Sequence, residues 1–172
     1  GIPMTHNQVL GIDLGTTNSA VSVWLEGRPV LVTNKFGEVL TPSVVGLDDD
    51  GNILTGRSAR DRLQTHPHLT QASFKRFMGT DVQLPLGQRQ FRAEELSALL
   101  LRQLKEDAEV WLGQAVSEAI ITVPAYFNDV QRRAVKNAAS LAGLNAIRLL
   151  NEPTAASLAF GLLENREQKY LT

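Results

Sequence analysis

The segment Gly11–Ser19 contains the residue types that proteins use to bind a phosphate group together with magnesium. Asp13 lies near the end of a short apolar, β-branched run, and the tight turn Gly15-Thr16-Thr17-Asn18 follows it. Backbone N–H groups and the two threonine hydroxyls of such a turn can bind phosphate oxygens, while the carboxylate holds a hydrated magnesium ion through its water ligands. The segment lacks the Gly-Lys-Ser/Thr ending of a P-loop. A hairpin that binds no ligand is the alternative interpretation.

A second segment places a carboxylate where α/β proteins bind ligands. Glu152 follows the predicted strand 147–150 and precedes the predicted helix 154–163, which Pro153 opens. Open α/β sheets bind ligands at the carboxyl ends of their strands, and the dipole of a following helix stabilises a carboxylate at that position. Glu152 could therefore order a water molecule. A simple capping glutamate is the alternative interpretation.

The elements that must position these residues are predicted from turn residues and hydrophobic periodicity. The chain opens with an antiparallel meander and ends with alternating strands and helices, which is typical of an α/β fold. The clearest helix, 93–112, has leucines at three- and four-residue spacing and ends at Gly113. Trp111 lies on the same apolar stripe and is expected to be part of the core. The start and end of the chain are expected to form one layer, with about residues 41–116 inserted between them. The predicted strands are 9–14, 20–25, 29–33, 44–47, 53–54, 119–123 and 147–150, and a small hairpin is predicted at 84–91. The other predicted helices are 58–64 and 130–142, and Asp129 is expected to cap the second of these. The segment 69–78 is predicted to be either helix or loop.

Two polar clusters in the sequence are not expected to form a functional site. Asp48-Asp49-Asp50-Gly51 fails the spacing of a calcium loop, because Gly46 stands where the first acid should be and Arg57 where the closing glutamate should be. It is predicted to be a turn between two strands. His66 and His68 flank a proline without partner ligands, so they are not expected to bind a metal.

Composition narrows the class of protein. The 172 residues include 43% hydrophobic and 20% charged residues, 17 Lys plus Arg against 18 Asp plus Glu, and no cysteine. A near-neutral chain without a basic stripe is not expected to bind nucleic acid or an anionic membrane. The absence of cysteine excludes disulfides and thiolate sites and favours a reducing compartment. The first eight residues do not resemble a signal peptide, so we expect a cytoplasmic protein.

Three segments together carry a family resemblance. The hairpin Gly11–Ser19, Pro124-Ala125-Tyr126-Phe127-Asn128-Asp129 and Asn151-Glu152-Pro153-Thr154-Ala155-Ala156 resemble heat-shock 70 kDa chaperones of the DnaK type, in the family's order and separation. The resemblance implies an α/β fold of the actin-like, ribonuclease H-like ATPase class: a mixed sheet flanked by helices, with a smaller inserted α/β subdomain. Residues 1–40 and 117–172 would form subdomain IA, and 41–116 subdomain IB. Residues 34–38, 74–76 and 104–109 resemble the specialised branch called HscC.

The resemblance also implies roles for single residues. Asp13 would hold hydrated magnesium, and Gly15, Thr16, Thr17 and Asn18 would bind the β- and γ-phosphates of ATP or ADP, with Thr17 nearest the transferred group. Lys75 matches the family's catalytic lysine, which would orient the attacking water and offset developing charge. Glu152 would position water and the water shell of the metal opposite Asp13, with potassium as an additional candidate ion. Without the resemblance, Lys75 is one surface cation among several.

A further group of matched positions concerns regulation. Pro124 and Arg132 match the pair with which the family senses nucleotide and relays its state to the substrate domain, although a strand simply ended by proline is the alternative interpretation. Arg148 and Asn151 match positions implicated in docking the interdomain linker and a J-domain co-chaperone; a solvated arginine at a strand end is the alternative there. Unfolded polypeptide clients and a nucleotide exchange factor are the other partners implied.

The family's second phosphate loop, Asp-Leu-Gly-Gly-Gly-Thr, does not occur in this sequence. The resemblance therefore implies lobe I alone, without the second lobe and the substrate-binding domain, and hence an ATP hydrolase whose isolated half binds ATP weakly and turns over negligibly. A sugar or acetate kinase of the same actin-like superfamily is the alternative, disfavoured by Asn-Glu-Pro-Thr-Ala-Ala. A non-enzymatic interaction module is a third class, disfavoured because Asp13, Thr17, Lys75 and Glu152 are all present.

Overall fold

The computed structural model describes residues 8–152, and a six-stranded mixed sheet forms its main layer. Five strands run in the order β11-β10-β1-β2-β3, and β4 pairs with β2 beside β3. β1 is parallel to β10, which is parallel to β11, whereas β1, β2 and β3 form the predicted antiparallel meander. The strands are β1 (Val9–Leu14), β2 (Asn18–Leu25), β3 (Arg28–Leu31), β4 (Thr41–Pro42), β10 (Glu118–Val123) and β11 (Asn145–Asn151). The predicted helix 154–163 lies outside the described residues.

Local sequence explains the central strands and their turns. β1 and β10 lie in the middle of the sheet, and their apolar residues, such as Ile12 and Ile121, are buried. The turn between β2 and β3 consists of Glu26 and Gly27, and both have positive φ angles, of 50° and 77°. Two positive φ angles are the requirement of the tight hairpin turn whose twist matches that of the strands.

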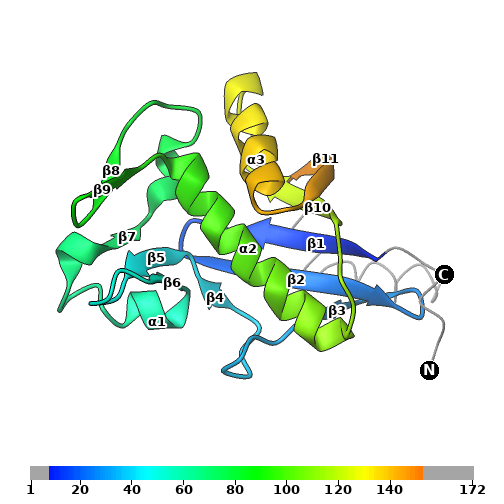
Figure 1. Cartoon of the computed structure of the whole chain (residues 1–172). Helices are drawn as coiled ribbons and strands as arrows, with labels where there is room; N and C mark the ends of the chain where they lie inside the picture. The colour runs from blue at the N-terminus through cyan, green and yellow to red at the C-terminus, as the bar shows by residue number, and fades with distance from the viewer. Residues whose placement is uncertain (1–7, 153–172) are drawn as a thin grey trace.

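The segment between β4 and the long helix 93–112 forms a smaller second layer at one end of the large sheet (Figure 1). Its sheet has the order β6-β5-β7, with β5 antiparallel to both neighbours. Its β5–β6 hairpin and the separate β8–β9 hairpin were both predicted from the sequence. The elements are β5 (Val44–Leu47), β6 (Ile53–Thr55), α1 (Arg57–Arg60), the 3-10 helix η1 (Pro67–Leu69), β7 (Thr70–Ala72), the 3-10 helix η2 (Phe74–Phe77), β8 (Leu84–Leu86) and β9 (Arg89–Phe91).

Helix α2 (Ala93–Leu112) joins the two layers. It runs across the large sheet in Figure 1 and contacts β1, β2, β5, β6, η2 and helix α3 (Asp129–Leu141). Its buried stripe includes Leu96, Leu100 and Leu104, as the three- and four-residue spacing predicts. The helix ends at Gly113, which has a φ of 73°, a conformation that favours glycine. One continuous core therefore holds both sheets.

Three local predictions are wrong or incomplete. The cap of α3 is Asn128, not Asp129: its side chain accepts from the N–H of Gln131 at 2.9 Å, and the Gln131 side chain accepts from the N–H of Asn128 at 2.9 Å. This reciprocal capping box fixes the start of the helix. Trp111 is 39% exposed rather than buried in the core. The ambiguous segment 69–78 contains a strand, β7, followed by η2, and is neither one helix nor a simple loop.

No helix among residues 8–152 combines the length and apolarity needed to cross a membrane.

Candidate functional site

The parallel strands bring the predicted site residues to one edge of the large sheet. In the register of β1, β10 and β11, Ile12 lies beside Ile121 and Thr122 beside Leu150. Asp13 is thus level with Thr122, and Glu152 comes directly after the end of β11. All lie at the carboxyl ends of parallel strands, where open α/β sheets bind ligands. We call Asp13, the turn Gly15–Asn18, Lys75 and Glu152 the strand-end site.

The turn between β1 and β2 requires glycine at its first position. A Cβ atom added to Gly15 would collide with the carbonyl oxygen of Asn18, which is backbone and cannot move aside. Thr16, Thr17 and Asn18 are exposed. Among residues 8–152, no group accepts a hydrogen bond from the backbone N–H of Thr16 or Thr17. Two N–H groups and two hydroxyls are therefore available to an anion.

The Asp13 carboxylate is held from one side only. It is partly buried, and the hydroxyl of Thr122, itself buried, donates a hydrogen bond of 2.9 Å to Asp13 Oδ1. Within the described part of the chain, Asp13 Oδ2 has no partner. Thr122 thus fixes the orientation of the carboxylate, and the second oxygen can accept hydrogen bonds from the water shell of a magnesium ion.

Lys75 and Glu152, 77 positions apart in the sequence, are in direct contact. Lys75 Nζ donates a hydrogen bond of 2.6 Å to Glu152 Oε1. The lysine side chain is only 10% exposed and the glutamate side chain 42%. The ammonium also lies 5.9 Å from the centre of the Phe127 ring. A buried ammonium needs a nearby anion, so a second anion that enters this place can compete with Glu152 for the lysine.

A left-handed residue introduces the segment that carries Lys75. Ser73 has φ 55° and ψ 31°, and η2 begins directly after it. Non-glycine residues rarely adopt this conformation, and it is maintained where the surrounding structure requires it. Phe74 and Met78, which flank the lysine on the chain, are both buried in the core. The backbone of η2 is therefore anchored on both sides of Lys75.

Comparison with known families shows the family to which the chain belongs. The family model described as Hsp70 protein matches two overlapping segments, residues 9–89 and 80–171. The chain belongs to the Hsp70 family. Proteins of this family are ATPases that bind ATP with magnesium and act with co-chaperones and polypeptide clients. The mixed sheet with its smaller second layer is the architecture of an actin-like Hsp70 ATPase lobe.

Four residues were matched by resemblance to regulatory positions of Hsp70 proteins. They lie on β11, on α3 and on the segment that joins β10 to α3. Arg132 donates through Nη2 to Asn151 Oδ1 at 2.9 Å and through Nε to the carbonyl of Phe127 at 3.0 Å. Pro124 follows β10, and its carbonyl accepts from the N–H of Phe127 at 3.0 Å. The structure therefore links Pro124 to Asn151 through Phe127 and Arg132. Arg148 does not belong to this chain of contacts.

Arg148 instead lines a groove of about 520 Å³ between α3 and β11. Four of the seven lining residues are basic and one is acidic. The basic residues are Arg132, Arg133, Lys136 and Arg148, and the acidic residue is Asp129.

Sequence reasoning missed the residues that support the strand-end site from behind. Thr122 was given no role, although it orients Asp13. Ser19 and Ser43 were given no role of their own, although both are buried and their hydroxyls lie 2.8 Å apart behind the turn. For Thr122 the available signal was its position in a strand beside β1. For the serines no sequence signal existed, because 24 positions separate them.

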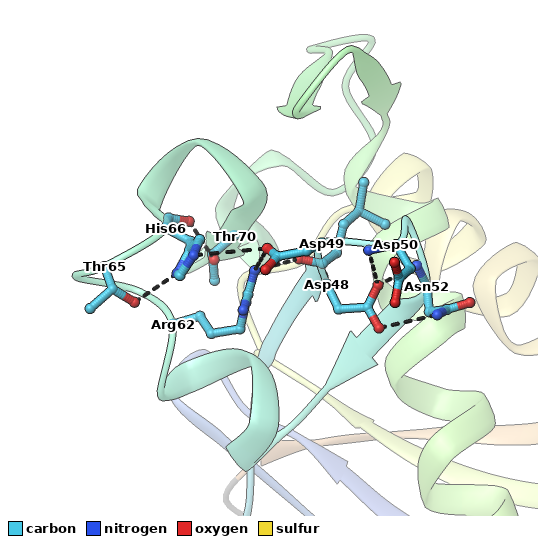
Figure 2. A network of polar contacts seen from close by, with 9 residues as sticks. Asp48, Asp49, Asp50, Asn52, Arg62, Thr65, His66 and Thr70 are labelled. Atoms are coloured by element: carbon cyan, nitrogen blue, oxygen red, sulfur yellow. Dashed lines mark hydrogen bonds and ion pairs between the residues drawn. The ribbon is translucent and has the colours of Figure 1, made fainter.

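The most acidic segment of the chain, Asp48–Asn52, is not part of this site, and Figure 2 shows its polar contacts. We call it, together with Arg62 and His66, the Asp48 loop. Asp48 Oδ1 accepts from the backbone N–H groups of Asp50 and Asn52, and Arg62 pairs with Asp49 at 3.0 Å. The N–H of Asn52 is the main cause that lowers the pKa of Asp48. The segment joins the antiparallel strands β5 and β6, so the prediction of a turn between two strands is confirmed.

Proposed function

We propose that this chain is lobe I of the nucleotide-binding domain of an Hsp70-type chaperone. In this proposal the strand-end site binds the phosphates and magnesium of ATP, and hydrolysis switches the affinity of the whole protein for unfolded polypeptide. The observation that carries the proposal is the meeting of three features at one sheet edge. Within residues 8–152, these are a turn with unpartnered N–H groups, a carboxylate with a free oxygen, and a buried lysine in contact with a single glutamate.

The residues present fit a magnesium phosphate, which supplies an electrophilic phosphorus and a cation to neutralise charge. Asp13 would hold the hydrated ion through Oδ2, and Gly15, Thr16, Thr17 and Asn18 would bind phosphate oxygens. Lys75 would place its ammonium beside the terminal phosphate and offset charge there. Glu152, paired with Lys75, would keep the ammonium in place and orient water. Potassium is an additional candidate cation for this site.

The exposure of the turn supports a site shared with a second lobe. Thr16, Thr17 and Asn18 are all exposed, so a phosphate bound there would contact this part of the protein on one side and water on the other. Ionic hydrogen bonds are much weaker in water than in an enclosed site. We therefore expect strong ATP binding only when a second lobe covers the turn.

Regulation would use the contacts at the end of β10. The links from Pro124 through Phe127 and Arg132 to Asn151 would relay the state of the nucleotide to the surface. The basic groove beside Arg148 supports docking of an interdomain linker or a J-domain co-chaperone that carries acidic groups. A nucleotide exchange factor is a further partner of the proposed cycle.

Two finer assignments complete the proposal. Segments 34–38, 74–76 and 104–109 support membership of the HscC-like branch, and the cysteine-free composition favours the cytoplasm. Residues 1–40 and 117–172 would form subdomain IA, and 41–116 subdomain IB. A boundary close to residue 41 is supported by the pairing of β4 with the large sheet and of β5, which follows it, with the small one.

The deciding experiment is a calorimetric titration of magnesium ATP. The titration is made into this chain and, in parallel, into the protein extended through a second nucleotide-binding lobe. We expect binding to the extended protein, loss of that binding when EDTA removes magnesium, and little or no heat from the chain alone. Equal binding to both would show that the turn is sufficient and would overturn the two-lobed account. Absence of binding in both would overturn the proposed function.

A further inference from the structure

Ser43 forms two hydrogen bonds with the turn Gly15–Asn18 of the strand-end site. It lies between β4 and β5, at the junction of the two sheets, and it is only 3% exposed. Its hydroxyl donates to the carbonyl oxygen of Gly15 at 2.7 Å, and its backbone N–H donates to the carbonyl oxygen of Thr17 at 2.8 Å. Both acceptors are carbonyls of the turn itself.

These two bonds determine which way the N–H groups of the turn point. All peptide bonds of residues 8–152 are trans, and in a trans peptide the C=O and the N–H point in opposite directions. The Gly15 carbonyl faces Ser43, so the N–H of Thr16 faces away from it. The Thr17 carbonyl also faces Ser43, so the N–H of Asn18 faces away as well. Ser43 thereby keeps two carbonyl oxygens off the side on which an anion would bind.

A second serine keeps the hydroxyl of Ser43 in its donating orientation. A hydroxyl has one proton, and that of Ser43 is used on Gly15, so the 2.8 Å contact between Ser19 and Ser43 has the Ser19 hydroxyl as its donor. Ser19 is 1% exposed and lies just after the turn on β2. Two buried hydroxyls therefore form a directed chain that ends on the Gly15 carbonyl.

We propose that Ser43 is a positioning residue for phosphate binding, and this inference rests on the proposed function of the strand-end site. Glycine tolerates many backbone conformations, so the peptide between Gly15 and Thr16 can rotate when nothing holds its carbonyl. A rotated carbonyl would present its negative end to the phosphate and withdraw one N–H donor. The Ser43 hydroxyl prevents this rotation, and the anchor comes from the junction between the two sheets rather than from the hairpin.

The test compares three variants of the two-lobed protein at a temperature at which all are folded. Ser43→Ala removes the bond to Gly15 but keeps the backbone bond to Thr17. Ser19→Ala removes only the supporting donor. Ser22→Ala is the matched control, because Ser22 is a buried serine of the same hairpin whose hydroxyl donates to another glycine carbonyl, that of Gly11, at 3.4 Å. Calorimetry measures the affinity for magnesium ADP and, separately, for adenosine, which has no phosphate.

We expect Ser43→Ala to weaken magnesium ADP binding about tenfold, which is the scale of one lost hydrogen bond, and to leave adenosine binding unchanged. Ser19→Ala should weaken ADP binding less, and Ser22→Ala less than twofold. A folded Ser43→Ala protein with ADP affinity within twofold of the unchanged protein would overturn the inference. An equal loss in Ser22→Ala, or a parallel loss of adenosine affinity, would also overturn it. If the unchanged protein binds no magnesium ADP, the proposed function itself fails.

Discussion

The strand-end site and the Asp48 loop are both rich in polar side chains, yet their polar groups are used in opposite ways. In the Asp48 loop, Asp48 accepts from two backbone N–H groups and from the side-chain amide of Asn52, while Asp49 pairs with Arg62. The carboxylates of Asp48 and Asp49 are thus both bound by other groups of the loop (Figure 2). In the strand-end site, N–H groups of the turn and one oxygen of Asp13 have no partner within residues 8–152.

The comparison shows that density of charge does not identify a site. The Asp48 loop has three consecutive acids, but the carboxylates of Asp48 and Asp49 act within the loop as a turn cap and an ion-pair partner. The strand-end site has fewer charges, and they come from distant parts of the sequence. The strand-end site is instead identified by hydrogen-bond donors and acceptors whose orientation is fixed by buried neighbours. Within residues 8–152, some of these groups have no partner of their own. Groups with fixed orientation and free capacity are what ligand binding requires.

Replacing Lys75 is expected to have the largest effect on the strand-end site. Lys75→Ala in the two-lobed protein should lower the rate of ATP hydrolysis about 100- to 1,000-fold, the usual loss when one preorganised group that stabilises the transition state is removed. Steady-state phosphate release measures this rate. Glu152, at 42% exposure, can be solvated after the lysine is lost, so the variant should still fold.

Lys105→Ala is the matched control for that experiment. Lys105 also forms an ion pair with a glutamate, Glu109, at 3.1 Å, but on α2 and away from the site. It should change hydrolysis less than twofold. Unchanged hydrolysis in Lys75→Ala would favour a non-enzymatic module that retains the fold.

A smaller effect is expected from a substitution that removes the charge of Asp13 but keeps the shape of its side chain. Asp13→Asn keeps Oδ1, which can still accept from Thr122, but it takes away the negative charge that attracts magnesium. The magnesium concentration that gives half-maximal ATP hydrolysis should rise at least about tenfold, the scale of one lost charged hydrogen bond. A magnesium titration at saturating ATP measures it. Asp50→Asn removes the same charge from the Asp48 loop and should leave the titration unchanged; equal shifts in both variants would contradict a specific role for Asp13.

The sequence predicted the elements of the fold well because they depend on local patterns. The leucine spacing gave α2 its bounds, and alternating strands and helices after Gly113 indicated the parallel part of the sheet. Trp111 was misplaced because periodicity places a residue on a face of the helix but does not show where the neighbouring sheet ends. The cap of α3 was missed because Asn128 and Asp129 are both good caps, and only the partner Gln131 distinguishes them.

The strand-end site was predictable in part, for a different reason. Asp13 and the turn could be proposed from residue types alone, since one short segment carries both. Lys75 could not, because its neighbours in space are Glu152 and Phe127, which are 77 and 52 positions away. Its assignment required the family resemblance. Neither residue types nor the family resemblance identified Ser43, because its role depends on hydrogen bonds to main-chain atoms, which residue types do not predict.

The smallest effect is expected in the Asp48 loop, and it concerns stability rather than activity. The N–H of Asn52 lowers the pKa of Asp48 in the folded protein, so the ionised carboxylate contributes stability above the ordinary aspartate pKa of about 3.9 and loses it as the pH falls through the lower folded value. Asp48→Asn keeps an acceptor for the loop N–H groups but has no charge to lose. Thermal unfolding followed by circular dichroism should therefore show the unchanged chain to be the more stable at pH 7, and the two curves should converge below about pH 4. A stability difference that stays constant across this range would contradict the account. ATP hydrolysis by Asp48→Asn should equal that of the unchanged two-lobed protein, because Asp48 bonds only within its own loop and lies outside the strand-end site.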